Sequence, residues 1–282
     1  MIDIGRHSGY GRFGFTILGS GSKGNATVIH APEGDFLLDA GFSAKELERR
    51  MTIREIDPES ILAMVVTHDH TDHVCGCRVF GDRYGIPVYV TAETCLLMGR
   101  NNELPEERIV IEPGTKFELC GLTVEPFSVS HDVEGTVAYT FRCGEEKLGY
   151  ATDLGSFGLL VTSRLKECRA IVLESNYDVR ALRASSRPEN VKRRIMSRHG
   201  HLSNENALEC LEQVLSPQTR DLILAHLSRE CNDPDLVAEG LRRKLESLNR
   251  PDIRWCVACQ DMPLDTVWLS EEDGLFSAGG ER

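Results

Sequence analysis

The segment His68-Asp69-His70-Thr71-Asp72-His73 is where this sequence could most directly support chemistry. Neutral imidazole nitrogens and a carboxylate oxygen together suit zinc, manganese or iron(II). A loop this short cannot wrap four ligands around one ion. It can present His68 and His70 to one ion, and Asp72 and His73 to a second. The segment therefore predicts two metal ions, with their remaining ligands supplied from elsewhere in the chain.

Three further residues, His131, Asp153 and His226, each follow an apolar run that reads as a strand. A lone histidine after a strand is usually a hydrogen-bonded structural residue. Here the shared position at strand ends, where α/β folds place their sites, favours all three as the missing ligands. The predicted metal site thus has seven residues.

A basic segment lies between Asp153 and His226. Residues 180–198 hold seven Lys and Arg side chains against one acid, in a chain whose formal net charge is −12. One interpretation is a solvated helix face; the other is a patch that meets phosphates. The segment ends just before a predicted helix capped by Ser203, whose exposed N-terminus would attract an anion. We predict that His201 either contacts the scissile phosphate or donates a proton to the leaving oxygen. Arg198 and His199 are further candidates for contact with that phosphate.

Over residues 15–269 the chain resembles the metallo-β-lactamase superfamily. Residues 68–73 are the signature of that superfamily, and its other motifs are matched by Asp39, His131, Asp153 and His226. Five further segments resemble its YycJ/WalJ-like branch, which is associated with DNA exonuclease activity and suggests a role in DNA repair or replication: residues 19–25, 130–141, 173–178, 198–204 and 225–232.

The resemblance implies a ligand for each metal position. One metal would be held by His68, His70 and His131. The other would be held by Asp72, His73 and His226. Asp153 would bridge the two ions, and Asp39 would orient the ligand loop from behind, a kind of support that commonly matters about 10–100-fold.

Two such cations would lower the pKa of a bound water to about 7 and so generate a hydroxide. The hydroxide would attack a phosphorus or a carbonyl carbon. We therefore predict that Asp72 and Asp153 take part in catalysis by holding the metals. His201 is predicted to take part as the proton donor. The cofactors would be two divalent ions, zinc, manganese or iron.

The favoured function is that of a metal-dependent phosphodiesterase, more specifically a DNA exonuclease. Its expected partner is therefore nucleic acid, and the sequence gives no sign of an obligate protein partner. A thioester or lactone hydrolase of the glyoxalase type is an alternative, but it needs no basic segment. An RNA-processing nuclease is another. The long Gly- and Pro-rich arm of the RNase Z type does not appear in the sequence, and the 73 positions from Asp153 to His226 leave little room for an inserted β-CASP domain.

The elements that must position these residues are short strands, followed by strands alternating with helices. Strands are predicted at residues 15–18, 25–31, 35–39, 61–67, 87–90, 109–111, 115–119, 122–129, 137–141, 147–151, 170–173, 222–225, 253–257 and 266–269. Helices are predicted at residues 43–51, 188–196, 203–215 and 235–248.

This order is typical of an α/β fold, and with the resemblance it implies a four-layer αβ/βα sandwich of two mixed sheets with helices outside. We expect one domain over residues 13–269 and a flexible tail over 270–282. With no long apolar stretch and no signal-peptide core in the sequence, we expect a cytoplasmic protein without membrane contact.

Overall fold

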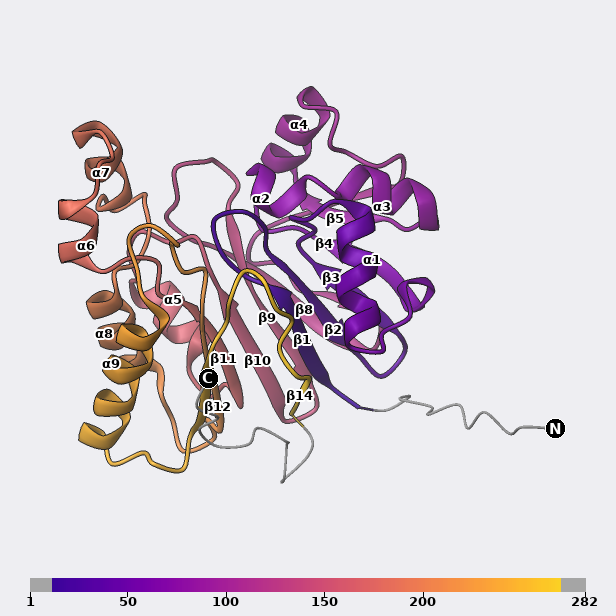
Figure 1. Ribbon diagram of the computed structural model, residues 1–282. Helices are drawn as coiled ribbons and strands as arrows, with labels where there is room; N and C mark the ends of the chain where they lie inside the picture. The colour runs from indigo at the N-terminus through magenta and orange to yellow at the C-terminus, as the bar shows by residue number, and fades with distance from the viewer. Residues whose placement is uncertain (1–11, 270–282) are drawn as a thin grey trace.

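The computed structural model describes residues 12–269, so the tail predicted at 270–282 lies outside the described residues. Within this range two seven-stranded sheets face each other (Figure 1). The first has the order β14-β1-β2-β3-β4-β5-β6. Its strands are β1 (Gly14–Gly19), β2 (Ala26–His30), β3 (Asp35–Leu38), β4 (Ile61–Val65), β5 (Val88–Thr91), β6 (Arg108–Ile111) and β14 (Val267–Trp268).

The second sheet has the order β13-β12-β11-β10-β9-β8-β7. Its strands are β7 (Phe117–Leu119), β8 (Leu122–Ser128), β9 (Val137–Cys143), β10 (Glu146–Ala151), β11 (Ala170–Glu174), β12 (Asp221–Ala225) and β13 (Arg254–Val257). Both sheets are mixed. Pairing is parallel from β3 to β6 and from β10 to β13, and antiparallel within β1–β3 and β7–β10.

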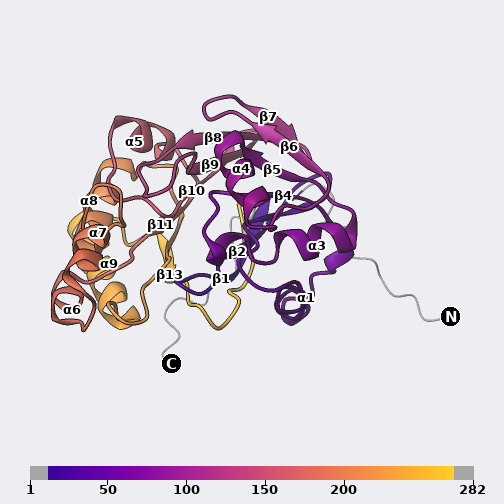
Figure 2. The same cartoon turned by 90° about the horizontal axis from the view of Figure 1, so that it is seen from above.

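Helices form the two outer layers. The first sheet is accompanied by α1 (Ala44–Ile53), α2 (Thr71–Val74), α3 (Cys77–Tyr84) and α4 (Ala92–Arg100), with a short 3-10 turn at Pro58–Ser60. The second is accompanied by α5 (Leu159–Leu165), α6 (Val179–Ala184), α7 (Glu189–Ile195), α8 (Asn204–Val214) and α9 (Pro234–Ser247). Seen from above, α1 and α3 lie outside one sheet, and α8 and α9 outside the other (Figure 2). The predicted four-layer sandwich is confirmed.

Three apolar cores hold these layers together. The central core joins the facing sides of the two sheets, for example Phe36 of β3 with Phe141 of β9, whose ring centroids are 5.7 Å apart. Each outer core joins one sheet to its own helices, such as Leu47 of α1 on the first side and Leu211 of α8 on the second. The removal of this apolar surface from water supplies most of the driving force for folding.

Serine side chains cap two of the helices, and the cap predicted at Ser203 is confirmed. The Ser43 side chain accepts a hydrogen bond from the backbone of Glu46, and that of Ser203 accepts one from Asn206. Helices α4, α5 and α6 are not predicted from the sequence patterns. A signal for α4 does exist, because Thr91, the last residue of β5, caps it by accepting a hydrogen bond from the backbone of Thr94. The α5 and α6 helices have no more than seven residues, so they carry little periodicity to recognise.

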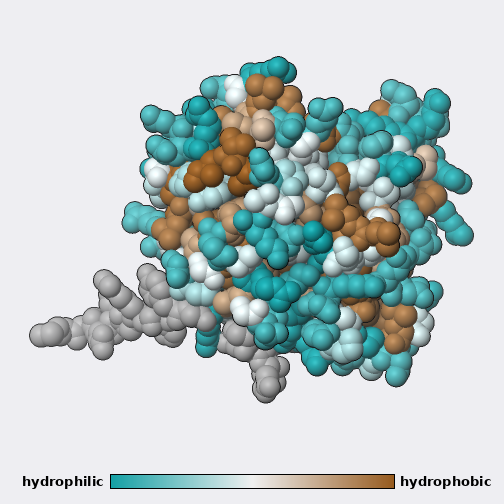
Figure 3. Space-filling model, turned by 180° about the vertical axis from the view of Figure 1, so that it is seen from behind, coloured by the Kyte–Doolittle hydropathy of each residue, from teal (hydrophilic) through white to brown (hydrophobic). Residues whose placement is uncertain are grey.

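Among residues 12–269, no helix has both the length and the apolar character needed to cross a bilayer. The face opposite to the view of Figure 1 carries hydrophilic side chains interspersed with small hydrophobic groups (Figure 3).

Candidate metal centre and substrate pocket

The candidate site forms where several strands end at the same edge of the two sheets. Asp39 directly follows β3, His68 comes soon after β4, Asp153 soon after β10, and His226 directly after β12. Because β3 and β4 run parallel, as do β10, β11 and β12, their carboxyl ends carry these side chains to one edge. This is the edge at which open α/β sheets bind ligands.

Three of these residues have left-handed backbones. The φ angles are 59° at Asp39, 59° at Asp153 and 56° at His226. Residues other than glycine seldom adopt this conformation, which costs about 1–3 kcal/mol each and clusters at functional sites. The fold thus accepts strain to turn these three side chains out of their strands and toward one another.

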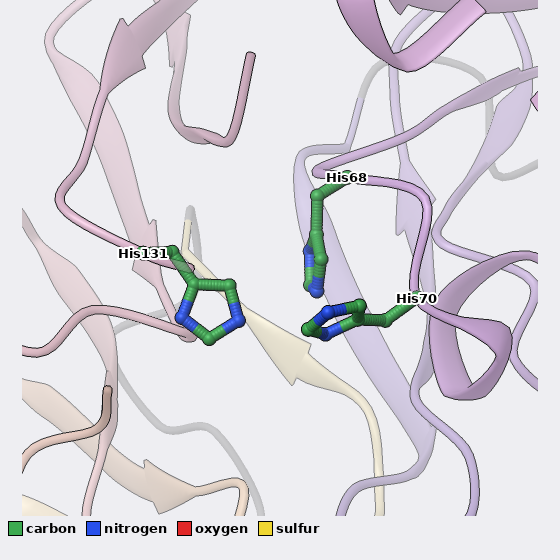
Figure 4. Close-up of side chains that lie close together, drawn as sticks. All are labelled: His68, His70 and His131. Carbon is green, nitrogen blue, oxygen red and sulfur yellow. The ribbon is translucent and has the colours of Figure 1, made fainter. Parts of the chain in front are cut away.

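The structure brings the predicted ligands into groups whose nitrogen and oxygen atoms lie within 4.8 Å of one another. One group is His68, His70 and His131, whose imidazoles converge from two sides of the site (Figure 4). Their ring centroids are 4.6 to 5.1 Å apart. The second group is Asp72, His73 and His226.

Asp153 lies between the two groups. Its Oδ2 is 3.3 Å from Nε2 of His73, and its Oδ1 is 3.3 Å from Nδ1 of His226 and 3.8 Å from Nε2 of His131. It is 1% exposed, so this carboxylate has no access to bulk water. Its position next to histidines of both groups is the one that a bridging ligand needs.

Several atoms of the site are buried without a hydrogen-bond partner. They are Nε2 of His68, His131 and His226, and Oδ2 of Asp153. Buried polar atoms in native proteins are almost always paired, so four orphans in one cluster call for a ligand. Imidazole nitrogen and carboxylate oxygen form the donor set of zinc, manganese and iron(II). The residues present therefore fit divalent metal ions.

Asp39 supports the ligand loop from beneath, as predicted by the resemblance. Its carboxylate accepts from the backbone N–H of Thr67 at 2.8 Å, from the Thr67 hydroxyl at 3.0 Å and from Nδ1 of His73 at 2.7 Å. Because the Thr67 hydroxyl donates to Asp39, its oxygen is free to accept from Nδ1 of His68 at 2.9 Å. Both histidines are then fixed in the tautomer that presents Nε2 to the metal centre.

His131 is held in the same way. Its Nδ1 donates to the carbonyl oxygen of Gly200 at 3.0 Å, which again leaves Nε2 facing the site. Gly200 admits no side chain, because a Cβ there would lie 2.1 Å from the carbonyl oxygen of Ile195. The tight turn before α8 thus supplies the backbone acceptor that orients His131.

Glu174, at the end of β11, is a site residue that sequence reasoning missed. It is fully buried, and its Oε1 accepts from Nδ1 of His226 at 2.7 Å and of His201 at 2.9 Å. Burial acts to raise the pKa of Glu174, but the adjacent His201 and His226 outweigh it and hold the pKa well below its usual range. Its place at the end of a predicted strand was the available signal.

Glu174 also contacts the segment before α8, where the sequence predicts an anion site. Its Oε2 accepts from the backbone N–H of Leu202 at 2.9 Å, and Ser203 is only 3% exposed. Leu202 precedes the helix, whose own N–H groups at Asn204 and Asn206 donate to the Tyr177 carbonyl and to the Ser203 side chain. The anion site before Ser203 stays a prediction.

Asp132 and Asn25 are two more residues that were not predicted. Oδ1 of Asp132 is 3.3 Å from Nε2 of both His70 and His131. Nδ2 of Asn25 is 3.1 Å from Nε2 of His73, and it belongs to the Gly-rich turn after β1. The sequence did contain hints that these two residues belong to the site. Asp132 adjoins His131, and Asn25 ends a Gly-rich segment.

The buried charges set the proton affinities of the histidines in opposite directions. Burial lowers the pKa of His68 well below its ordinary value, and the neighbouring histidines add to that effect. Burial also disfavours the charged form of His73, but Asp153, Asp39 and Asp72 overcome it and raise its pKa to about 9. The second group therefore binds positive charge strongly, whether as protons or as a metal ion.

A cavity of about 300 Å³ opens onto this centre. Its lining joins ligand candidates to residues of the basic segment and of nearby loops: Ser22, His70, Asp72, Asp132, Asp153, Asn176, Tyr177, Leu182, Arg187, Arg194, Ile195, His201, His226, Ser228 and Cys231. Such a volume is at the lower end of the range of about 300–1,000 Å³ for small-ligand pockets.

The structure separates the three predicted substrate contacts. His201 lines this cavity, whereas the exposed residues Arg198 and His199 are not among its lining residues. Both of these contact Ser130 instead: its hydroxyl donates to the Arg198 carbonyl at 2.8 Å and lies 3.0 Å from Nδ1 of His199. The basic side chains that do reach the cavity are Arg187 and Arg194.

Comparisons with known proteins agree with this geometry. The sequence model of the Beta-lactamase superfamily domain matches residues 35–227. The chain is 33% identical over 234 residues to Exodeoxyribonuclease YycJ of Bacillus anthracis, a match covering 82% of this chain and 89% of the relative. It is 31% identical over 228 residues to Exodeoxyribonuclease WalJ of Streptococcus pneumoniae serotype 2, covering 79% and 85%.

Solved structures show the same fold at lower identity. The metallo-beta-lactamase fold protein YhfI from Bacillus subtilis has a TM-score of 0.67 at 13% identity, with 90% of this chain and 99% of that chain covered. Zn(2+)-bound PqqB from Methylobacterium extorquens has a TM-score of 0.66 at 18% identity, with 89% and 99% covered. The predicted resemblance to the metallo-β-lactamase superfamily and its YycJ/WalJ-like branch is confirmed.

Proposed function

This chain belongs to the metallo-β-lactamase superfamily of hydrolases, and on that premise we propose that it is a metal-dependent phosphodiesterase that degrades DNA from its ends. The observation that carries the proposal is the convergence of seven side chains able to hold metal ions beside a cavity that four of them line, together with two arginines. The names of the two relatives reported above, both exodeoxyribonucleases, support DNA as the substrate.

We assign one divalent ion to the group of His68, His70 and His131, and a second to the group of Asp72, His73 and His226, with Asp153 between them. Zinc, manganese and iron(II) all suit these ligands. When bound, such ions lower the pKa of water and offset the negative charge that develops on a phosphodiester under attack.

The chain's own residues orient this chemistry. Asp39, Thr67 and Glu174 hold Nδ1 atoms of the ligand histidines, so that each ring keeps one orientation and one tautomer. Because these partners are buried, the site needs little rearrangement when substrate binds.

His201 is the proposed proton donor to the leaving oxygen. Its Nδ1 faces Glu174 at 2.9 Å, which leaves Nε2 as the atom that can exchange a proton with substrate. Burial lowers the pKa of His201, but Glu174 and then Asp153 outweigh it and raise the pKa above its ordinary value. A raised pKa favours the protonated imidazole, which is the form that a general acid requires.

A cleavage panel tests the proposal. Metal-stripped protein is reloaded with Mn²⁺ or Zn²⁺ and offered end-labelled single- and double-stranded DNA, RNA, bis-p-nitrophenyl phosphate and S-lactoylglutathione. We expect metal-dependent loss of the DNA end label and release of nitrophenol. Turnover of the thioester with intact nucleic acids would instead identify a hydrolase of the glyoxalase type.

Two histidine variants provide the controls for this panel. His68→Ala removes an assigned ligand, so phosphodiesterase activity should fall to background. His30→Gln alters a buried histidine that pairs with Asp35 far from the site, so metal-dependent activity should remain. If both variants lost activity equally, the loss would reflect unfolding and not metal binding.

A further inference from the structure

Helices α6 and α7 form a small arm beside the site (upper left in Figure 1). The arm has its own apolar cluster, which includes Tyr177, Leu182, Ile195 and Cys231 and is separate from the three large cores. Leu182 and Ile195 also line the cavity, so the arm is one wall of the pocket. Its position is therefore fixed by packing, and the side chains it presents to the cavity are held near the metal centre.

Arg194, in the last turn of α7, is linked directly to the first ligand group. Its Nη1 is 3.2 Å from Oδ2 of Asp132, and Oδ1 of the same carboxylate is 3.3 Å from Nε2 of His70 and His131. One carboxylate thus spans the distance between Arg194 and the atoms assigned to a metal ion. The side chain of Arg194 is nevertheless 64% exposed, so part of its guanidinium is open to solvent.

Arg187, between α6 and α7, is the second arginine of the cavity wall. Its Nη2 and Nε are 2.9 Å and 3.0 Å from Oε2 of Glu230, a side chain that is 70% exposed. A surface pair of this kind is weak and exchanges readily for another anion. Among the described residues, Arg187 and Arg194 are the Lys and Arg side chains that line this cavity.

Side chains of both charges line the cavity. Asp72, Asp132 and Asp153 line the same wall as the ligand histidines, and bound divalent ions would neutralise them. Arg194 borders this region through Asp132, and Arg187 pairs with Glu230 outside it, so the positive charge of both arginines would remain on the cavity wall. A guanidinium has five N–H donors, so each arginine can keep its carboxylate and still bind a phosphate oxygen.

We infer that Arg187 and Arg194 form a phosphate-binding pair for a second phosphate of the substrate, next to the one that is cleaved. The pair makes the pocket selective for a strand with consecutive phosphates over an isolated diester. The inference rests on the proposed phosphodiesterase function and adds the substrate feature that the arm recognises. It also assigns the basic segment a defined contact through two of its seven basic residues.

The test compares substrates with and without a second phosphate. Full-length Arg187→Ala, Arg194→Ala and the double variant are loaded with Mn²⁺ and given DNA and bis-p-nitrophenyl phosphate. We expect KM for DNA to rise about 10-fold for each single variant, the value of one charge-assisted hydrogen bond, and KM for bis-p-nitrophenyl phosphate to rise much less, with the metal content of every variant measured alongside. The salt dependence of DNA binding should flatten by roughly 0.7 per arginine removed.

Arg243→Ala on α9 is the matched control. Arg243 also pairs with an exposed carboxylate, at 2.6 Å from Glu239, but it does not line the cavity, so KM for DNA should not change. Arg187→Lys and Arg194→Lys should recover part of the affinity because they restore charge without the planar fork. Equal losses on DNA and on the small diester would overturn the inference, as would a DNA KM unchanged in the double variant.

A binding measurement separates this inference from the proposed function. Calorimetric titration of wild-type and double-variant protein with deoxythymidine 3′,5′-bisphosphate reports on the arginine pair without any cleavage. If wild-type protein failed to cleave DNA but bound the bisphosphate about 10-fold or more tightly than the double variant, the phosphate pair would stand and the exonuclease proposal would fail. Equal binding by both proteins would overturn the pair, whatever the cleavage result.

Discussion

Glu174 holds His226 in place, because its Oε1 lies 2.7 Å from Nδ1 of that histidine. The same oxygen accepts from His201 at 2.9 Å, so one fully buried carboxylate orients an assigned metal ligand and the proposed proton donor together. This double role makes Glu174 the residue whose alteration should affect both metal affinity and turnover.

Glu174→Gln keeps the shape of the side chain and removes its charge. We expect metal affinity to fall by about 10–100-fold, because the orientation of His226 is no longer fixed by a carboxylate. Zinc affinity is measured by competition with a chromophoric chelator. Glu125→Gln is the control, since Glu125 is also shielded but pairs with Arg164 on the surface. Unchanged zinc affinity in Glu174→Gln would remove the proposed orienting role.

Asp39→Asn tests the support beneath the ligand loop. Asparagine tolerates the left-handed backbone at this position, where φ is 59°, so the fold should survive. An amide cannot accept all three hydrogen bonds that the carboxylate takes from Thr67 and His73. We expect metal affinity and activity to fall by about 10–100-fold with an unchanged circular dichroism spectrum.

Asp35→Asn is the matched control for this variant, because Asp35 also pairs with a histidine, His30, but on the far end of β3. Its metal affinity should equal that of the wild type. If Asp39→Asn and Asp35→Asn behaved alike, the contact with His73 would have no special part in metal binding.

Metal removal should lower thermal stability. The buried ligand atoms without partners, among them Nε2 of His68 and Oδ2 of Asp153, are satisfied only when an ion is bound. Binding to the folded state alone stabilises by about 2.7 kcal/mol at a free metal concentration of 100 times Kd. Calorimetric melting of stripped protein with increasing Zn²⁺ should therefore show a rising Tm. His68→Ala should show a smaller rise, and an identical rise in both proteins would contradict the ligand assignment.

The sequence indicates the candidate metal ligands, which the structure brings together, but not the residues that support them, for a physical reason. His68, His70, Asp72 and His73 lie so close in the chain that their spacing alone indicates a metal loop. Glu174 has no such spacing. Its role appears only because β11 pairs with both β10 and β12, which places the end of β11 between Asp153 and His226.

The basic segment shows the same limit. Its charge was evident, but a charge pattern does not say which side chains face the site. Packing of Leu182 and Ile195 turns Arg187 and Arg194 toward the cavity and leaves Arg198 outside its lining. The surroundings of the anion site predicted before Ser203 also depend on a distant residue, because Glu174, more than twenty residues away in sequence, accepts from the Leu202 N–H there.

His201→Ala is expected to lower kcat by about 10²–10⁴-fold on DNA, the usual range for loss of a general acid, with metal content retained. The loss should be smaller on bis-p-nitrophenyl phosphate, whose nitrophenolate leaves without needing a proton. His199→Ala is the comparison, because His199 is exposed and contacts Ser130 outside the cavity lining, so we expect a much smaller loss. Equal losses on both substrates would contradict proton donation by His201.

Glu46 on α1 provides a pH dependence that is separate from the metal centre. Hydrogen bonds from Arg49, and then from Arg50, lower the pKa of Glu46 from its ordinary 4.5 to about 2. Arg50 in turn donates to the carbonyl oxygens of Leu18 and Gln260, so the pair ties α1 to the end of β1. Because the pKa is depressed in the folded state, its contribution to stability is present above pH 4.5 and is lost as the pH falls through about 2.

Glu46→Gln should therefore lower the free energy of unfolding at neutral pH by no more than about 1 kcal/mol, since the pair is partly open to solvent. The difference from wild type should shrink as the pH falls from 4.5 toward 2. Urea denaturation of both proteins across this range measures it, with the exposed Glu106→Gln as a control that should show no such trend. A difference that stayed constant with pH would mean that Glu46 acts through the shape and packing of its side chain, because only a charge-dependent contribution disappears on protonation.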